Sequence, residues 1–164
     1  MKLSHKILHI VSIVCIVVAF VLCAIPLYVS TKDTTFTYSI FGLAYCYTGV
    51  YSGILTGQIF GMVAGVFAIF GLVATLMNGK SGVVFSSLFS FLCGTTAAVL
   101  TYLTQVFFTY NDAVYVPRDF TSTGTCWIVA SLFVVSAVIE LICVIKTTKE
   151  IGLEKKQSQP KDIK

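Results

Sequence analysis

Four long apolar stretches limit what this chain can fold into. Three of them contain no charged residue, and the last contains a single acid, Glu140. The hydrocarbon core of a bilayer is about 30 Å thick and a helix rises about 1.5 Å per residue, so one crossing needs roughly 20 apolar residues. The sequence therefore predicts an all-α membrane protein, built as a four-transmembrane-helix bundle. The four stretches cover residues 7–29, 54–77, 83–108 and 125–145.

The composition of the 164 residues agrees with this fold class. Hydrophobic residues make up 57% and charged residues only 11%, whereas a soluble domain has about 25% charged residues. We expect one transmembrane domain over residues 1–148, followed by a basic, disordered tail over 149–164. The net charge of +4 then reflects membrane topology and not a nucleic-acid partner. The lipid bilayer is the first expected partner.

The distribution of basic residues predicts the orientation of the chain. With the N-terminus in the cytoplasm, every Lys and Arg except Lys32 and Arg118 lies on the cytoplasmic side, as the positive-inside rule requires. All eight Tyr and the single Trp127 then fall in the outer half, where they suit the membrane–water interface. The first stretch is longer than the apolar run of a signal peptide, about 7–15 residues, so we expect it to be retained. We predict a multi-pass protein of the plasma membrane with both termini cytoplasmic.

The second stretch carries a glycine at every fourth position. On a helix this spacing makes one slowly drifting stripe of minimal side chains, and such stripes let transmembrane helices approach closely. The stripe either packs against another helix of the same chain or forms the contact with a second copy or another membrane protein. Its members are Gly49, Gly53, Gly57, Gly61 and Gly65.

A second face of small residues runs along the third stretch. Its members recur at spacings of three and four residues, the heptad-like pattern of left-handed helix packing. In lipid, small and hydroxyl-bearing side chains support close contact and hydrogen bonds between helices. We expect this face and the glycine stripe to form the helix-packing interfaces of the bundle. The face consists of Ser87, Ser90, Gly94, Ala97 and Thr101.

The connection between the first and second stretches is the longest one in the chain. Within it Phe36, Tyr38 and Ile40 alternate with Thr and Ser, which is the period-two pattern of a half-buried strand. We predict a small extracellular β hairpin or sheet in this first outer loop, resting on the end of the bundle.

Most of the six cysteines lie inside the apolar stretches. Only Cys46 and Cys126 reach the outer, oxidising side of the predicted topology. A disulfide between them is one interpretation, and two free thiols are the other. No Cys-x-x-Cys motif occurs, which argues against thiol oxidoreductase chemistry.

Glu140 is the one ionisable residue deep inside an apolar stretch. Intramembrane carboxylates are candidates for proton or ion pathways, but a carboxylate near the inner face can also snorkel to the surface or pair with Lys80. His5 and His9 are spaced as two metal ligands on one helix face. Without a third ligand nearby, we interpret them as interfacial side chains. We therefore expect neither a metal nor another cofactor.

Motifs for common enzyme chemistry do not occur in the sequence. There is no P-loop, no dinucleotide-binding fingerprint and no His-Glu-x-x-His. A Gly-x-Ser-x-Gly elbow is also missing. We therefore expect a protein that is not an enzyme and has no catalytic residues.

Residues 41–46 in the first outer loop read Phe-Gly-Leu-Ala-Tyr-Cys. With four spans, cytoplasmic termini and a strand-like first loop, the chain resembles the claudin-like four-span superfamily. That group includes claudins, peripheral myelin proteins, fungal cortical four-span proteins and amastins. Ala44 stands where claudins have Trp, and the second loop cysteine of that family is missing. The resemblance implies a structural and adhesive role without catalysis.

Together these patterns predict a non-enzymatic protein for membrane organisation, adhesion or surface interaction. It would act through helix packing and through its first extracellular loop. Self-association or contact with other membrane proteins is the expected partner interaction. The alternative is an accessory subunit of a channel, a transporter or a larger membrane complex, in which Glu140 would face water or the bundle interior.

Overall fold

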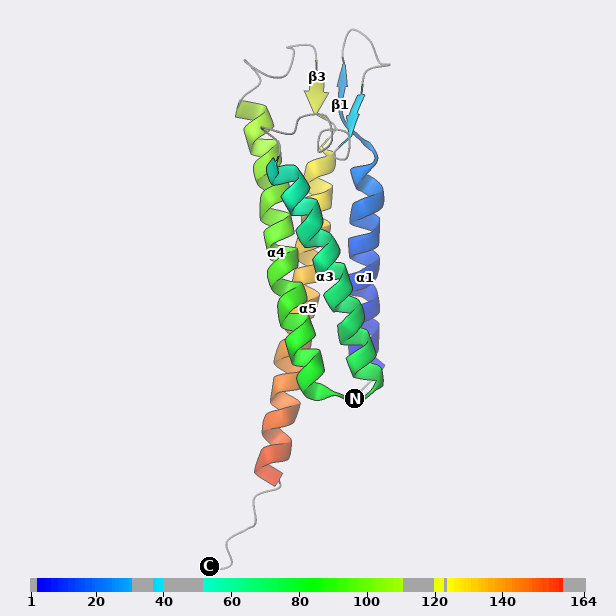
Figure 1. Cartoon of the computed structure of the whole chain (residues 1–164), viewed down its shortest axis with the longest axis vertical. Helices are drawn as coiled ribbons and strands as arrows, with labels where there is room; N and C mark the ends of the chain where they lie inside the picture. Colours follow the sequence, from blue (N-terminus) through cyan, green and yellow to red (C-terminus); the bar gives the residue numbers. More distant parts are fainter. Residues whose placement is uncertain (1–2, 31–36, 40–51, 111–119, 123, 158–164) are drawn as a thin grey trace, which may run out of the picture.

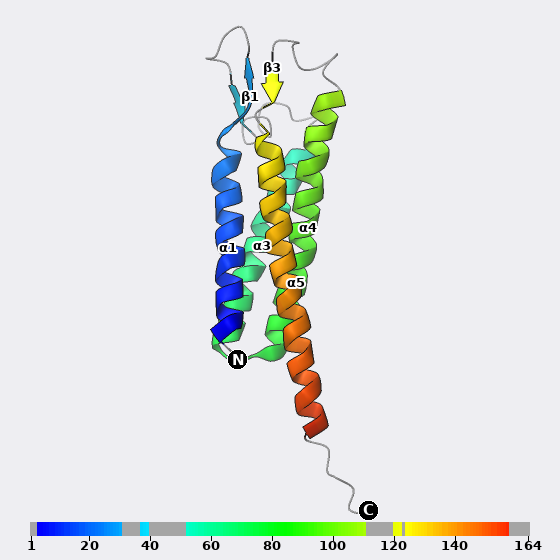
Figure 2. The same cartoon turned by 180° about the vertical axis from the view of Figure 1, so that it is seen from behind.

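A computed structural model of the full chain describes residues 3–30, 37–39, 52–110, 120–122 and 124–157. In these residues the chain forms α1 (Leu3–Cys23), β1 (Pro26–Ser30), β2 (Thr37–Ser39), α3 (Ser52–Leu76), α4 (Lys80–Tyr110), β3 (Phe120–Ser122) and α5 (Thr125–Gln157). The helices run alongside one another as a bundle, and the strands gather at one end of it, as both views show (Figures 1 and 2).

The described part of the chain contains four helices that are long and apolar enough to cross a membrane. This finding confirms the prediction of four helices of spanning length, and it is compatible with a multi-pass integral membrane protein. The orientation of the termini and the identity of the membrane stay predictions. Within the bundle, α3 contacts α4, α4 contacts α5, and α1 contacts both α5 and α3. The first and last helices are therefore direct neighbours.

The first helix ends earlier than the apolar stretch 7–29 predicts. α1 stops at Cys23, and the rest of the stretch continues into strand β1. Pro26 has no N–H group and disfavours helical backbone at the residue before it. The Leu-Tyr-Val that follows suits an extended strand. Hydropathy could not show this change, because apolar residues serve either element.

Strand β1 is the centre of a three-stranded antiparallel sheet with the order β2-β1-β3. β2 falls within the segment whose alternating pattern suggests a strand, whereas β1 and β3 come from segments without that pattern. β1 follows the first helix and β3 precedes the last one, so the sheet joins two connections that lie at one end of the bundle and are far apart in the sequence. The extracellular position of this sheet stays a prediction.

A tight turn joins α3 to α4. Asn78 has a φ of 57°, the left-handed conformation that commonly ends a helix. The Gly79 N–H donates to the Ala74 oxygen at 2.8 Å, and the Asn78 N–H donates to the Thr75 oxygen at 3.3 Å. These two bonds form a Schellman motif, which ends α3 and lets α4 return antiparallel beside it (Figure 1).

The last helix is longer than predicted. α5 continues to Gln157, so the expectation of disorder from residue 149 onward is wrong for residues 149–157. Lys, Glu and Gln in this segment are good helix formers, and Glu154 accepts a hydrogen bond from Lys80 at the start of α4. Residues 158–164 lie outside the described part of the chain.

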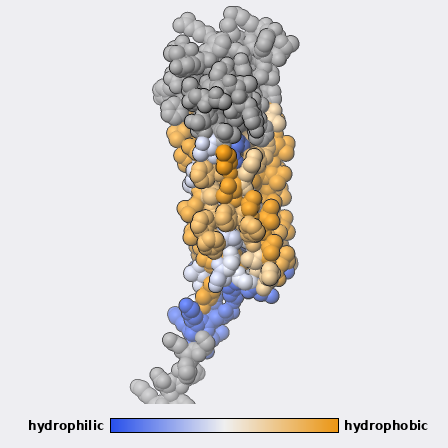
Figure 3. All heavy atoms as spheres, in the orientation of Figure 1, coloured by the Kyte–Doolittle hydropathy of each residue, from blue (hydrophilic) through white to orange (hydrophobic). Residues whose placement is uncertain are grey.

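The bundle has an apolar outside and an inside of small residues. Large exposed side chains such as Val14, Phe70 and Ile128 lie along all four helices, and Figure 3 shows a largely apolar surface over the bundle. Ala, Ser, Cys and Thr make up much of the interior, with Phe133 as the largest fully buried side chain. This distribution suits lipid, in which close contact of small residues holds helices together.

Candidate functional site

The buried face of α1 carries several polar residues. Its members are spaced four, three, four, three and four residues apart, which places them in one line along the helix. His5 and His9 belong to this line and are only 1% and 0% exposed. The interpretation of both as interfacial side chains is therefore wrong, because the bundle encloses the rings. The face consists of His5, His9, Ser12, Ile16, Ala19 and Cys23.

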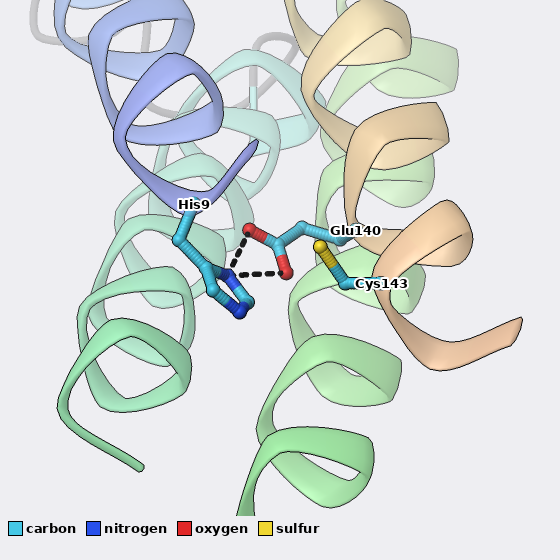
Figure 4. A group of neighbouring side chains, drawn as sticks. All are labelled: His9, Glu140 and Cys143. Carbon is cyan, nitrogen blue, oxygen red and sulfur yellow. Dashed lines mark hydrogen bonds and ion pairs between the residues drawn. The ribbon is translucent and has the colours of Figure 1, made fainter. Parts of the chain in front are cut away.

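His9 of α1 contacts Glu140 of α5 inside the bundle (Figure 4). The Nδ1 atom of His9 lies 3.2 Å from Oε1 and 3.2 Å from Oε2 of the carboxylate. When the carboxylate is ionised, Nδ1 carries the hydrogen and donates it. Neither side chain is exposed, so this contact replaces the hydration of both groups and is costly to break.

Neither of the two simple structural explanations for Glu140 applies. The residue is 0% exposed, so its carboxylate does not snorkel to the membrane surface. Lys80, the cation predicted as a partner, donates to Glu154 instead. Glu140 thus faces the bundle interior, the placement expected of a functional acid within a membrane.

Gly71 of α3 provides the space that the His9 ring occupies. A Cβ atom at position 71 would lie 2.8 Å from Cε1 and 3.1 Å from Nδ1 of His9, too close for the ring to stay in place. The Ser86 hydroxyl of α4 lies 3.2 Å from the same point. The imidazole is therefore enclosed by α3 and α5 in addition to its own helix.

A second polar contact joins α1 to α5 about one helical turn from the first. The buried hydroxyls of Ser12 and Ser136 lie 2.8 Å apart. Nearer the sheet, the Cys23 thiol donates to Oε1 of Gln58 at 3.4 Å, which links α1 to α3. Side-chain hydrogen bonds thus hold α1 to its neighbours at three levels along its length.

Cys143 completes a group of three side chains that could hold a metal ion. It follows Glu140 by three residues, so both side chains lie on one face of α5. The ligand atoms of His9, Glu140 and Cys143 all lie within 4.8 Å of one another, and all three residues are buried. The sequence offered no third ligand close to the histidines, because these partners come from the other end of the chain.

The glycine stripe of α3 faces the interior wherever the structure describes its contacts. A Cβ atom on Gly57 would lie 3.1 Å from Leu100 of α4, and one on Gly61 would lie 2.8 Å from the ring of Phe133 in α5. A Cβ atom on Gly65 would lie 3.3 Å from a side chain of α1. These three glycines therefore allow close contacts between helices of the same chain.

The small-residue face of α4 is buried as well. The Ser90 hydroxyl donates to the Ala64 backbone oxygen of α3 at 2.9 Å. A Cβ atom on Gly94 would lie 3.4 Å from the Cβ atom of Ala137 in α5. The face therefore fills the space between α3 and α5. All five predicted members are buried: Ser87, Ser90, Gly94, Ala97 and Thr101.

Three other predicted site residues lie wholly or partly outside the described chain. Gly49 and Cys46 are not described, and Gly53 is described only as part of the α3 backbone. Cys126 is a fully buried free thiol. Its candidate disulfide partner, Cys46, lies outside the described residues, and the thiol of Cys126 is not in a disulfide.

One signal in the sequence points to the polar cluster. His5, His9 and Ser12 are spaced four and three residues apart in an otherwise apolar helix, which indicates one buried polar face. The fourth apolar stretch carries the same spacings in Ser136, Glu140 and Cys143. α1 and α5 lie antiparallel (Figure 1), so the order of the polar residues on one helix is reversed relative to the other. Ser12 therefore lies beside Ser136, and His9 lies beside Glu140.

These features define a class of protein: a four-helix bundle of membrane-spanning length, with a small sheet at one end and a polar cluster between its first and last helices. The chain matches no protein-family model, and no curated protein or solved structure shows significant similarity to it. The resemblance to the claudin-like superfamily therefore stays a prediction.

Proposed function

We propose that this chain is a non-enzymatic, multi-pass membrane protein that acts in membrane organisation, adhesion or surface interaction. The observation that supports this function best is the pairing of β1 with β3. Only two residues separate α1 from β1, and only two separate β3 from α5. The sheet is therefore attached directly to the two helices that the His9–Glu140 and Ser12–Ser136 contacts hold together.

This attachment restricts the movement of the sheet relative to the bundle. Both short links limit it, and β1 also contacts α5. A surface that is held in place loses less conformational entropy when it binds a partner, so this end of the molecule is suited to recognition. The positive-inside rule puts the same end on the outer side of the membrane.

The proposed interaction surface is the sheet end and not the glycine stripe. The described glycines of the stripe are in contact with other helices of the bundle. A second copy or another membrane protein would meet the sheet end or the apolar outer faces of the helices. One such face carries an aromatic cluster, in which the ring centroid of Phe89 lies 5.2 Å from that of Phe67 and 4.6 Å from that of Phe85.

Attachment of protein-containing vesicles to cells, or to vesicles with the same protein, tests this proposal. Val29 is paired with Thr37 on one side and with Thr121 on the other, and a central strand does not accommodate proline. We expect roughly tenfold weaker attachment for Val29→Pro, the effect of about 1.4 kcal/mol. Val29→Thr keeps a β-branched residue and serves as the control. No attachment by the wild type, or equal attachment by a folded Val29→Pro protein, would contradict the proposal.

A second candidate function is that of an accessory subunit in a channel, transporter or larger complex. The position of Glu140 favours it, because the carboxylate faces the bundle interior and contacts His9. Proton and ion pathways use ionisable side chains in such places. Cation or proton flux into vesicles that is lost in Glu140→Gln and kept in Glu154→Gln would support this function. Flux no faster than in empty vesicles would exclude a pathway through the chain alone.

A further inference from the structure

A group of three different ligand types is buried between α1 and α5. His9 offers an imidazole nitrogen, Glu140 a carboxylate oxygen and Cys143 a thiol sulfur, all within 4.8 Å of one another. Figure 4 shows the three side chains together in the space between the two helices. Nitrogen, oxygen and sulfur ligands of these kinds are those that Zn²⁺ binds in proteins.

The polar atoms of this group are incompletely satisfied. Among the residues that the structure describes, Oε2 of Glu140 has no hydrogen-bond partner, although it lies 3.2 Å from Nδ1 of His9 as an ion-pair contact. Both residues are fully buried. A buried carboxylate oxygen that accepts no hydrogen bond destabilises the folded state unless a donor or a cation compensates for it. A cation between the imidazole, the carboxylate and the sulfur would supply this compensation.

We propose that His9, Glu140 and Cys143 bind a divalent transition-metal ion, and that Zn²⁺ is the best match. Zinc bonds of about 2.0–2.3 Å in a tetrahedral arrangement place the ligand atoms roughly 3–4 Å apart. The 3.2 Å between Nδ1 and the carboxylate already fits that spacing. The sulfur of Cys143 lies within 4.8 Å of the other two ligand atoms, so coordination requires it to move closer to them.

The ion occupies the place where the Nδ1 hydrogen now bridges to the carboxylate. Coordination needs a neutral imidazole lone pair and a thiolate, so Nδ1 and the thiol each release any proton that they carry to the solvent. Three protein ligands leave a fourth tetrahedral position.

This site goes beyond the proposed function and does not depend on it. The simpler alternative is that His9 and Glu140 form only a structural contact between two helices. Their hydrogen bond does not require Cys143, whereas the metal site does. Substitution of Cys143 therefore distinguishes the two explanations.

The test measures Zn²⁺ bound to the full-length protein in nanodiscs, after chelator treatment, incubation with Zn²⁺ and desalting. We expect close to one Zn²⁺ per chain for the wild type. Loss of a residue that only supports a metal ligand weakens binding by about 10–100-fold, so Cys143→Ser and Glu140→Gln should each weaken it by at least about tenfold. Cys93→Ser is the matched control, because Cys93 is also a buried free thiol and lies outside the group.

Co²⁺ provides a second measurement, whose result for the wild type does not depend on the folding of any variant. A thiolate bound to Co²⁺ gives a charge-transfer absorption band in the near ultraviolet. We expect this band in the wild type and in Cys93→Ser, and its loss in Cys143→Ser. Three results would overturn the proposal: no stoichiometric Zn²⁺ on the wild type, equal Zn²⁺ binding by the two folded serine variants, or bound Co²⁺ without the thiolate band.

Discussion

The Nδ1 atom of His9 lies 3.2 Å from both carboxylate oxygens of Glu140, although 131 residues separate the two in the sequence. Both side chains are fully buried, so the contact acts at low dielectric constant, where an unpartnered polar group is costly. A one-residue shift of either helix would separate the pair. The contact therefore favours a single register between α1 and α5.

Loss of one member of this pair is expected to destabilise the bundle strongly. In His9→Leu or Glu140→Leu, the remaining buried group has no partner, and we expect the free energy of unfolding to fall by about 3 kcal/mol. The double variant His9→Leu/Glu140→Leu should recover most of this loss, because neither polar group remains. Unfolding by SDS titration in mixed micelles measures all three. A double variant as unstable as the sum of the single variants would contradict this account.

Gly61→Ala is expected to lower the free energy of unfolding by about 1–3 kcal/mol, because it overpacks the interior. The added Cβ atom would lie 2.8 Å from the ring of Phe133, which is fully buried and has little room to move. Gly152→Ala is the matched control. Nothing lies within 4 Å of its added Cβ atom, and alanine favours a helix over glycine by up to about 1 kcal/mol.

Light scattering in nanodiscs measures the oligomeric state of the wild type and of Gly61→Ala. We expect Gly61→Ala to change stability but not the size of the folded species. A smaller folded species at unchanged stability would show that the stripe acts between chains.

Asn78→Val is expected to destabilise the turn between α3 and α4 by about 1–2 kcal/mol. The φ of 57° at Asn78 lies in the left-handed region, which a β-branched residue adopts poorly. Asn78→Gly should be neutral or slightly stabilising, because glycine has no Cβ atom to clash. Thermal unfolding of both variants in one detergent makes the comparison. Equal melting temperatures would mean that the turn does not depend on this conformation.

Lys80 and Glu154 form an ion pair that, unlike the buried His9–Glu140 pair, is partly open to solvent. Their side chains are 24% and 63% exposed. Water and salt screen such a pair, so Glu154→Gln should change the free energy of unfolding by less than about 0.5 kcal/mol. Glu140→Gln, at the buried pair, should have the larger effect. Chemical denaturation of the two variants side by side provides the measurement. Similar losses would indicate that the end of α5 contributes to stability as much as the bundle interior does.

The four helices could be predicted because length and hydropathy are local properties of the chain. About 20 apolar residues in a bilayer satisfy their backbone groups best as a helix. The small-residue faces of α3 and α4 could also be predicted from the sequence, since their members recur at helical spacing. The sequence could not show whether such a face packs inside the bundle or contacts another chain. Only the positions of Leu100 and Phe133 against Gly57 and Gly61 decided it.

The sequence by itself determined the class of fold, because a membrane permits few arrangements for four long apolar segments. The tertiary structure decided the rest. Residues 26–29 belong to an apolar stretch long enough for one helix, but they pair with β2 and β3 as part of a strand. Nothing in the sequence around His9 or around Glu140 shows that these two residues form a pair. They meet because α1 and α5 pack antiparallel in one register, and a register between two helices exists only once they are in contact.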